Sequence, residues 1–403
     1  MQDDRGRRLP QRLGRADFLK LGALAAGTGI LAACGGADDE VSESRPPAPA
    51  PQEAAGTSAA ASPPEPPAEA EPAHPPIEDE SGDLLVFEWA GYEVKPLWRA
   101  YRQKFPDDKP KFAFLTSDDQ AISKVAGGFT ADLVHPCVGY VADWVELGVV
   151  QPFDPSLLSH FGELNPALVQ AGQVNGEQYF IPADWGFSAP LYRADKVDPR
   201  EDSWTLLYDE RYEGKISWWD SFENLVIGGY VRGFADPWDM SDDELEIVKE
   251  DLVAAKPLVR NFWSSYTDLN TDLANGNVWI AYAWPDAWLA AKGEGLDVVY
   301  MEPKEGRLSW VCGFLLFAST ENYHYAHEFV DAWISSETAL WTLENYAYGH
   351  ANTSVDVAAL DPALVAAFGL DDSAVLQEPR AHIDRHVPRR RLYNKIWSEI
   401  KAA

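Results

Sequence analysis

Residues 84–115 read LLVFEWAGYEVKPLWRAYRQKFPDDKPKFAFL, and this stretch carries a complete strand–helix–strand pattern. Leu84–Phe87 is a short apolar run typical of a buried strand. Pro96–Phe105 spaces its large apolar side chains as a helix does, and Lys111–Leu115 is a second apolar run. Strands separated by helix-length segments predict βαβ units, in which a parallel sheet is covered by helices.

The same alternation continues toward the C-terminus. Further strands are predicted at Asp132–Val134, Lys215–Trp219, Val278–Trp284, Val298–Met301 and Phe314–Phe317, and helices at Gln120–Ala126 and Ala326–Ile334. The chain has 403 residues, 46% of them hydrophobic and 12% aromatic, which is enough for about two domains with cores of their own. We therefore predict an α/β protein with mostly parallel sheets.

The charge balance excludes several classes of protein. The chain has 64 acidic and 33 basic side chains, a formal net charge of −31, whereas nucleic-acid binding requires a basic face. Its three cysteines cannot form a disulfide framework. Beyond the N-terminus there is no apolar run of about 18 residues, which argues against a polytopic membrane protein.

The N-terminus, residues 1–33, is predicted to be a signal peptide. Basic residues precede a short apolar run, Leu21–Ala33, which ends in small side chains. Leu31–Gly35, LAACG, resembles a bacterial lipobox, whose cysteine is lipidated; the alternative is an ordinary export signal that contains Cys34 by chance. Arg15–Lys20 resembles a twin-arginine motif that lacks its second arginine, so the export route stays open. We expect a protein exported to the periplasm or to the outer face of the cytoplasmic membrane and anchored there through lipid on Cys34.

Residues 34–83 differ in composition from the rest of the chain. They are rich in Pro, Ala, Glu and Ser and almost lack large apolar side chains. Such a segment cannot bury enough apolar surface to offset the entropy that ordering would cost. We predict a disordered tether that holds the folded body close to a membrane.

The residues that follow the predicted strands suggest the kind of ligand. In open α/β sheets, ligands bind beyond the carboxyl ends of the strands. The four segments at these positions contain aromatic and acidic side chains but no lysine or arginine: Glu88–Tyr92, His135–Cys137, Asp220–Glu223 and Pro285–Asp286. Carboxylates bind ammonium groups and aromatic faces attract cations, so this composition predicts a ligand that is both apolar and positively charged.

Structural alternatives exist for the same residues. Asp220 and Glu223 have the spacing of a helix capping box, with Asp220 as the N-cap. Pro285-Asp286 is also a common way to open a helix. Most of the 16 tryptophans must pack in cores rather than contact a ligand.

Several short motifs resemble the extracellular spermidine/putrescine-binding proteins of bacterial ABC importers. The similarity is collinear from about residue 84 to 401 and includes FEWAGY at 87–92, ADLVHP at 131–136, GVVQPFD at 148–154, YFIPADWG at 179–186, LANG at 273–276, WPDA at 284–287 and PKEGRLSW at 303–310. The resemblance implies a two-lobe, flytrap-like periplasmic-binding-protein fold of type II, with the ligand between the lobes. The first lobe would comprise 84–184 plus about 286–325, and the second 185–285 plus about 326–403.

The resemblance also implies a ligand site, in which acidic residues take the amines and aromatic residues sandwich the carbon chain. The positions that correspond are Trp89, Tyr92, Cys137, Asp220, Glu223, Trp284, Asp286 and Trp310. The chain departs from the family at four of the neighbouring positions. Ala90 replaces a hydroxyl residue, Cys137 replaces a ligand-side serine, Gly139 stands where an aromatic is common, and Cys312 stands where an acid is common.

These features predict a substrate-binding lipoprotein that captures a polyamine for an ABC permease, as a monomer and without a cofactor or metal. The sequence contains no Walker loop, HExxH, GxSxG or Cys-x-x-Cys motif, so no enzymatic activity is predicted. The alternatives are a carbohydrate-binding importer component or an extracellular glycoside hydrolase, because carboxylates flanked by tryptophans also describe a sugar-cleaving site. Cys137 and Cys312 are predicted to be free thiols, with a disulfide as the alternative.

Overall fold

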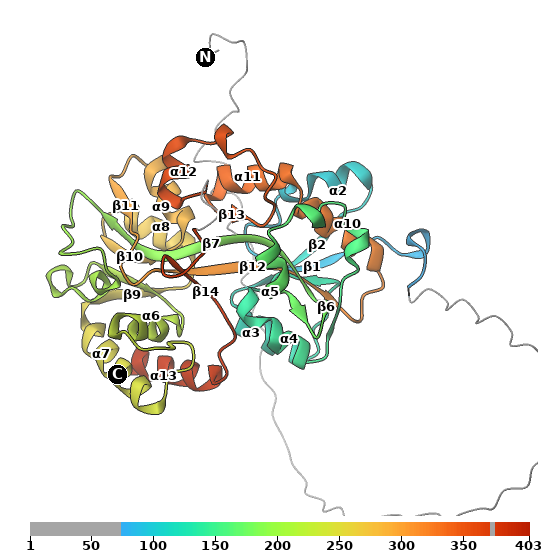
Figure 1. Cartoon of the computed structure of the whole chain (residues 1–403). Helices are drawn as coiled ribbons and strands as arrows, with labels where there is room; N and C mark the ends of the chain where they lie inside the picture. Colours follow the sequence, from blue (N-terminus) through green and yellow to red (C-terminus); the bar gives the residue numbers. More distant parts are fainter. Residues whose placement is uncertain (1–73, 371–374) are drawn as a thin grey trace, which may run out of the picture. The chain divides into compact units, whose positions relative to one another are not determined.

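The computed structural model describes residues 74–370 and 375–403 (Figure 1). The predicted signal peptide, Cys34 and the tether up to residue 73 therefore lie outside the described residues. Within the described ranges, none of the helices is long and apolar enough to cross a membrane.

A mixed sheet runs through the folded body, with the central order β2–β1–β3–β12–β7–β10–β8–β9. Its strands are β1 (Leu85–Trp89), β2 (Lys111–Leu115), β3 (Leu133–Val134), β4 (Val150–Gln151), β7 (Phe180–Arg193), β8 (Ile216–Trp219), β9 (Val259–Trp263), β10 (Ile280–Ala283), β11 (Val298–Tyr300), β12 (Arg307–Phe317), β13 (Gly349–His350) and β14 (Ala381–Ile383). A separate hairpin pairs β5 (Gln173–Val174) with β6 (Glu177–Gln178). The sheet contains two parallel groups: β1 pairs with β2 and β3, and β8 pairs with β9 and β10.

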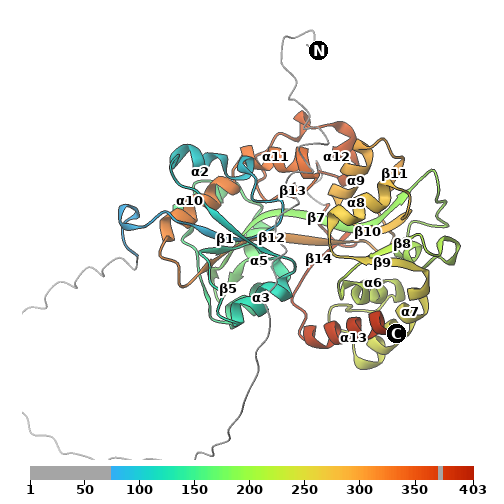
Figure 2. The ribbon, with the colours of Figure 1, turned by 180° about the vertical axis from the view of Figure 1, so that it is seen from behind.

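Helices cover both parallel groups (Figures 1 and 2). They are α2 (Arg99–Lys104), α3 (Asp118–Ala126), α4 (Val141–Glu146), α5 (Pro166–Ala171), α6 (Glu223–Arg232), α7 (Asp242–Ala255), α8 (Tyr266–Ala274), α9 (Pro285–Gly293), α10 (Tyr323–Trp333), α11 (Ser336–Tyr346), α12 (Pro362–Phe368) and α13 (Arg390–Ala402). This arrangement of parallel strands and covering helices confirms the α/β class predicted from residues 84–115.

Two long antiparallel strands, β7 and β12, join the parallel groups and run side by side through the middle of the body (Figure 1). The first half of β7 pairs with β12, and its second half pairs with β10 and β11. The far end of β12 pairs with β3. A bulge between Cys312 and Gly313 shifts the register in the middle of this pair.

The buried apolar side chains form two clusters. The first lies around β1, β3 and the crossing strands, and Phe87, Phe314 and Trp333 are among its fully buried members. The second lies around β8, α6 and α7 and includes Trp218 and the α13 residue Trp397. Burying a side chain of this size contributes about 1.5–3 kcal/mol. Each group of parallel strands thus has a core that stabilises it.

The boundaries of the predicted lobes can be compared with the packing. Helix α10, which the sequence assigned to the second lobe, packs against α2 of the first: the Phe329 ring lies 5.7 Å from Tyr101 and 6.3 Å from Trp98. Helix α13, which has the same assignment, belongs to the second core (Figure 2). The division into lobes remains a prediction, and α10 is one of the elements whose packing differs from it; the Thr338 hydroxyl of α11 likewise donates to the Leu97 carbonyl of the first lobe.

The segment just before β1 is packed onto the first core. Glu80 accepts hydrogen bonds from the backbone N–H groups of His324 and Tyr325, at the open start of α10. Asn322 accepts hydrogen bonds from the Ser81 hydroxyl and the Gly82 N–H. A carboxylate at a helix N-terminus satisfies free N–H groups and is favoured by the helix dipole. Packed structure therefore begins before residue 84, the end predicted for the tether.

Candidate functional site

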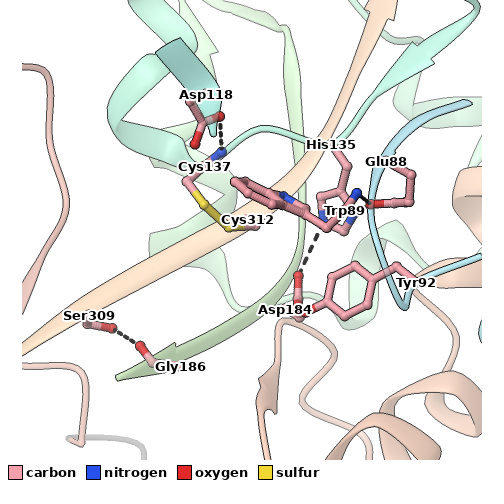
Figure 3. The surroundings of a disulfide bond; sticks show 10 residues. All are labelled: Glu88, Trp89, Tyr92, Asp118, His135, Cys137, Asp184, Gly186, Ser309 and Cys312. Carbon is pink, nitrogen blue, oxygen red and sulfur yellow. Dashed lines mark hydrogen bonds and ion pairs between the residues drawn. A yellow bond between two sulfur atoms is a disulfide. The ribbon is translucent and has the colours of Figure 1, made fainter. Parts of the chain in front are cut away.

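The first predicted site residues lie where β1 ends. Trp89 is the last residue of the strand, and its indole N–H is buried without a hydrogen-bond partner among the described residues. In Figure 3 the indole points toward the disulfide between Cys137 and Cys312. Tyr92 lies in the turn that follows, and its hydroxyl donates to Asp184 Oδ2 on β7 at 2.5 Å. Trp89 and Tyr92, two of the four aromatic residues of the predicted set, are thus held beside the crossing strands.

Asp286 lies in the first turn of α9, after Trp284 and the N1 proline Pro285. Pro285-Asp286 opens a helix, as the structural alternative for this segment proposed, and the Asp286 carboxyl is also buried. Burial raises the pKa of its carboxyl to about 6, although the Tyr348 hydroxyl and nearby N–H groups lower it. Its Oδ1 atom is buried without a hydrogen-bond partner among the described residues. A buried carboxylate oxygen of this kind is costly unless a donor satisfies it.

Tyr348 connects Asp286 to other predicted residues. Its ring packs edge-on against Trp310, with centroids 4.8 Å apart. The pKa of its hydroxyl is raised well above the usual range by burial and by the charges of Asp286 and Asp184. Tyr92 is affected in the same way by burial, Asp184 and Tyr348. We call Asp286, Tyr348, Tyr92 and Asp184 the Asp286 end of the site.

Glu223 belongs to a second group of buried acidic residues. It is the first residue of α6, and its Oε2 atom accepts a hydrogen bond from the Tyr282 hydroxyl at 2.5 Å. Burial raises the pKa of Glu223 to about 7; the bond from Tyr282 opposes this rise, and the charge of Asp118 adds to it. The pKa of Asp384 is also raised by burial and by the charges of Glu223 and Asp118. We call Glu223, Asp118, Asp384 and Tyr282 the Glu223 end of the site.

Asp118 and Asp384 reach this end from other parts of the chain. Asp118 begins α3, after the N-cap Ser117, and its Oδ1 atom accepts from the Cys137 N–H at 3.1 Å. It is only 6% exposed, and burial raises its pKa to about 7 against the opposing effects of the Cys137 N–H and Arg390. Asp384 follows β14 and donates its N–H to the Ser309 carbonyl on β12.

The backbone around Asp384 explains one departure from the family pattern. A Cβ atom at Gly139 would lie 3.1 Å from the Arg385 carbonyl oxygen. Glycine at this position therefore lets the segment after β14 approach the loop that begins at Cys137. A larger side chain would displace the backbone next to Asp384. The glycine at 139 and the position of the Asp384 carboxylate are thus parts of one arrangement.

Sequence reasoning missed both of these carboxylates. Asp118 follows β2 by three residues, so the rule that selected Glu88–Tyr92 would have found it if it had been applied to that strand. Asp384 follows a three-residue strand, β14, which has no periodic signal of its own. Only the pairing of β14 with β12 places it at the site.

Aromatic side chains connect the two ends. The Trp219 ring lies 5.7 Å from Tyr282, whose hydroxyl bonds Glu223, and 5.2 Å from Trp284, which precedes Asp286. On the opposite strands, Trp310 contacts Tyr348, and its neighbour Ser309 accepts the Asp384 N–H. The Trp310 indole N–H, like that of Trp89, is buried without a partner in the described part of the chain.

Cys137 and Cys312 form a disulfide, so the prediction of free thiols is wrong (Figure 3). The two residues form an isolated antiparallel bridge between the loop after β3 and strand β12, with Cα atoms 4.0 Å apart. This pairing could not be derived from two cysteines separated by 175 residues. Cys137 therefore contributes a crosslink between a first-core loop and a crossing strand, and its thiol is not available to a ligand.

Asp220 is the one predicted acid that the structure does not bring to either end. Its Oδ1 atom accepts hydrogen bonds from the Trp397 indole at 2.8 Å and from Lys401 at 2.5 Å, both on α13. It is not a capping residue either, because the N-cap of α6 is Phe222 and no side chain caps that helix. Asp220 thus links α13 to the loop after β8 through hydrogen bonds, and its carboxylate is not part of the candidate site.

The other predicted residues are packed together rather than spread around an open hollow. Surface hollows of about 580 and 670 Å³ are lined by other residues, among them Asp242 and Arg389 in one and Arg200 and Asp251 in the other. Among the described residues, no cluster of histidine, cysteine and acidic side chains is suited to hold a metal ion. The predicted residues thus form a packed cluster of aromatic side chains with buried carboxylates at both ends.

The body thus consists of two cores joined by crossing strands, with buried carboxylates and aromatic side chains beside these strands. The chain belongs to the bacterial extracellular solute-binding protein family, whose model matches residues 116–367. Members of this family bind solutes and are not enzymes, so this chain is a binding protein. Membership in an extracellular family also indicates that the protein is exported.

Individual relatives and solved structures that resemble the chain are also solute-binding or ABC-transporter proteins. The chain is 26% identical to a putrescine-binding periplasmic protein of Escherichia coli, over 68% of this chain and 79% of the relative. Its fold is similar to that of a putative spermidine/putrescine ABC transporter from Listeria monocytogenes, with a TM-score of 0.71 at 20% identity over 80% of this chain and 99% of that one. The PBP MotA from A. tumefaciens, solved in complex with glucopine, has a TM-score of 0.64 at 12% identity, with 79% and 99% coverage. The predicted two-lobe periplasmic-binding-protein fold of type II is thereby confirmed.

Proposed function

We propose that this protein captures a linear polyamine, such as putrescine or spermidine, and delivers it to an ABC importer. The observation that carries the proposal is the pair of desolvated carboxylate groups, the Asp286 end and the Glu223 end, joined by aromatic side chains. At each end a buried carboxylate oxygen, on Asp286 or Asp384, has no hydrogen-bond partner among the described residues. A molecule with an ammonium group at each end of a carbon chain complements this arrangement.

The energetics favour a cationic ligand over a neutral one. Burying carboxylates without counter-charges is unfavourable, which is why the pKa values of Asp118, Glu223 and Asp286 are raised. An ammonium group that enters such a site donates charge-assisted hydrogen bonds and neutralises the charge. Trp89 and Trp310 supply aromatic faces for the methylene chain and for cation–π contacts. A sugar offers the same carboxylates hydrogen bonds but no neutralising charge.

Binding is proposed to be coupled to closure of two lobes. Asp118 lies on α3 beside the first core, whereas Glu223 and Tyr282 lie on elements of the second. These groups repel one another when they are brought together without a cation. A polyamine that contacts both sides lowers the free energy of the closed form only, so it shifts the population from open to closed.

The remaining parts of the proposal concern the setting of the protein. The signal peptide at 1–33 would direct export, lipid on Cys34 would anchor the chain, and residues 34–73 would tether the body to the membrane. The partners would be a polyamine and the permease of the importer, and the binding protein would act as a monomer.

A thermal-shift screen of the purified protein tests the ligand class. Putrescine, cadaverine, spermidine and agmatine would be compared with glucose, maltotriose, a glucopine and neutral amino acids. A ligand at 100 times its Kd stabilises the folded state by about 2.7 kcal/mol, which corresponds to a shift in Tm of several degrees. We expect such shifts with the di- and polyamines only. Stabilisation by a sugar or the glucopine, with none by any amine, would contradict the proposal and support a carbohydrate-type ligand.

A further inference from the structure

A network of buried polar side chains lies beside Trp89 and Tyr92 (Figure 3). Glu88 on β1, His135 after β3 and Asp184 on β7 are each completely buried. His135 Nδ1 lies 2.8 Å from Glu88 Oε1, and His135 Nε2 lies 3.2 Å from Asp184 Oδ1. Both ring nitrogens therefore face carboxylate oxygens, and an imidazole donates to two acceptors at once only when it is protonated on both nitrogens.

Other hydrogen bonds occupy the same carboxylates. Glu88 Oε1 also accepts a hydrogen bond from the backbone N–H of Trp89 at 2.8 Å. Asp184 Oδ2 accepts one from the Tyr92 hydroxyl at 2.5 Å. The Glu88 Oε2 atom is buried without a partner among the described residues. The hydrogen-bond network thus runs from the backbone of Trp89, a proposed ligand residue, through His135 to the hydroxyl of Tyr92, another proposed ligand residue.

The surroundings of His135 favour its charged form. Burial by itself lowers the pKa of an imidazole, but Glu88 and Asp184 together raise the pKa of His135 to about 10. The other titratable groups around it are Tyr92, 5.4 Å away between ring centroids, His350 on β13 and Asp118 on α3. Burial lowers the pKa of His350 to about 4, so it adds no positive charge that would oppose His135 at neutral pH. Phe314 and Trp333 complete the environment with ring contacts at 4.3 and 5.2 Å.

We propose that His135 is a positioning residue of the ligand site: held as an imidazolium between Glu88 and Asp184, it donates to Asp184 Oδ1 and so keeps Asp184 in place to accept the Tyr92 hydroxyl on Oδ2. The Tyr92 hydroxyl then donates its hydrogen bond to Asp184, so the Tyr92 oxygen can only accept hydrogen bonds from a ligand. Such an oxygen accepts a hydrogen bond from an ammonium group and gives nothing to an acceptor. His135 thereby helps the site to select ligands that donate hydrogen bonds. The inference rests on the proposed function for its ligand, but the charge of His135 depends on no ligand.

The charge of His135 is tested by NMR of the ring nitrogens in the ¹⁵N-labelled protein at pH 8.5. Ordinary histidines have a pKa of about 6.5 and are neutral at this pH. Among the eight histidines of the chain we expect one imidazolium pattern, which disappears in His135→Gln. If every histidine is neutral at pH 8.5, the proposal is overturned, and this result needs only the parent protein.

The effect on the ligand is tested with Asp184→Asn and Tyr92→Phe. The amide of Asp184→Asn has the same shape but can donate to the Tyr92 oxygen, which reverses the hydrogen bond. We expect putrescine affinity to fall about tenfold in this variant. In the Tyr92→Phe background the same substitution should have little further effect, because the oxygen through which it acts is gone. An equal loss in both backgrounds would show that Asp184 acts through general stability and would contradict the proposal.

His324→Gln provides a matched control. His324 also pairs with a buried carboxylate, since its Nδ1 atom lies 2.7 Å from Glu80 Oε1, but this pair caps α10 away from the site. We expect unchanged putrescine affinity in this variant. If the parent protein binds no amine, the proposed function fails, whereas the ring-nitrogen spectra still decide the charge of His135.

Discussion

Replacing Glu223 with glutamine is expected to weaken putrescine binding by about 2–5 kcal/mol, which is roughly 30-fold to several thousand-fold in Kd. Glutamine keeps the shape of the side chain and its bond with the Tyr282 hydroxyl but removes the charge. Asp118 and Asp384 remain, so the loss reflects the contribution of one carboxylate to a shared site. Isothermal titration calorimetry of the parent protein and the variant measures the difference.

Asp220→Asn is the matched control for this experiment. Asp220 lies three residues earlier, and the family resemblance assigns it the same role, but its carboxylate is bonded to Trp397 and Lys401 on α13. We expect its putrescine affinity to stay within about a factor of three of the parent value, because this carboxylate lies at neither end of the site. If Asp220→Asn lost most of its putrescine affinity and Glu223→Gln lost none, the role that the family resemblance assigns to Asp220 would be right. The assignment based on the observed contacts would then be wrong.

The second large effect is a loss of affinity at low pH. The pKa values of Asp118 and Glu223 are raised to about 7, and that of Asp286 to about 6, because burial disfavours their charged forms. A bound ammonium favours the charged forms, so these carboxyls must release protons when the ligand binds. Putrescine itself stays doubly charged throughout, since alkylammonium groups have a pKa of about 10.

Affinity is therefore expected to fall as the pH drops from 8 to 5, by about tenfold per pH unit for each proton released. Calorimetry at pH 6.5, in buffers of different ionisation enthalpy, counts the released protons directly. Asp286→Asn should release fewer protons than the parent protein does, because one of the raised carboxyls is gone. Affinity that stays constant between pH 8 and 5, with no proton release, would show that these carboxyls do not contact the ligand.

The parts of the fold that the sequence predicted are those with strong local patterns. Lys111–Leu115 and residues 216–219 are regular apolar strands followed by helices, so their period and length identify them. Strand β7 was missed because its sequence, FIPADWGFSAPLYR, contains two prolines and a glycine, which normally demote a strand. The long antiparallel partners of β7 sustain the strand in spite of these residues.

The candidate site likewise contains residues that the local sequence identifies and residues that only tertiary contacts bring to it. Trp89, Tyr92, Glu223 and Asp286 could be found from the sequence because each lies at the end of a strand or within a few residues after it. Asp384 and the partnership of His135 with Asp184 depend on contacts between distant segments, which no local pattern encodes. The environment of Asp220 likewise depends on α13, which lies 170 residues or more downstream. Tertiary contacts thus decided which of several plausible carboxylates belong to the site.

A crystal structure of the protein grown with putrescine tests the central claim most directly. The proposal predicts one ammonium group within hydrogen-bonding distance of Asp286 and the other within reach of Glu223 or Asp384, with the methylene chain against Trp89 and Trp310. Putrescine bound away from these residues, or a closed protein in which Asp286 and Glu223 contact only water while the amine lies elsewhere, would contradict it.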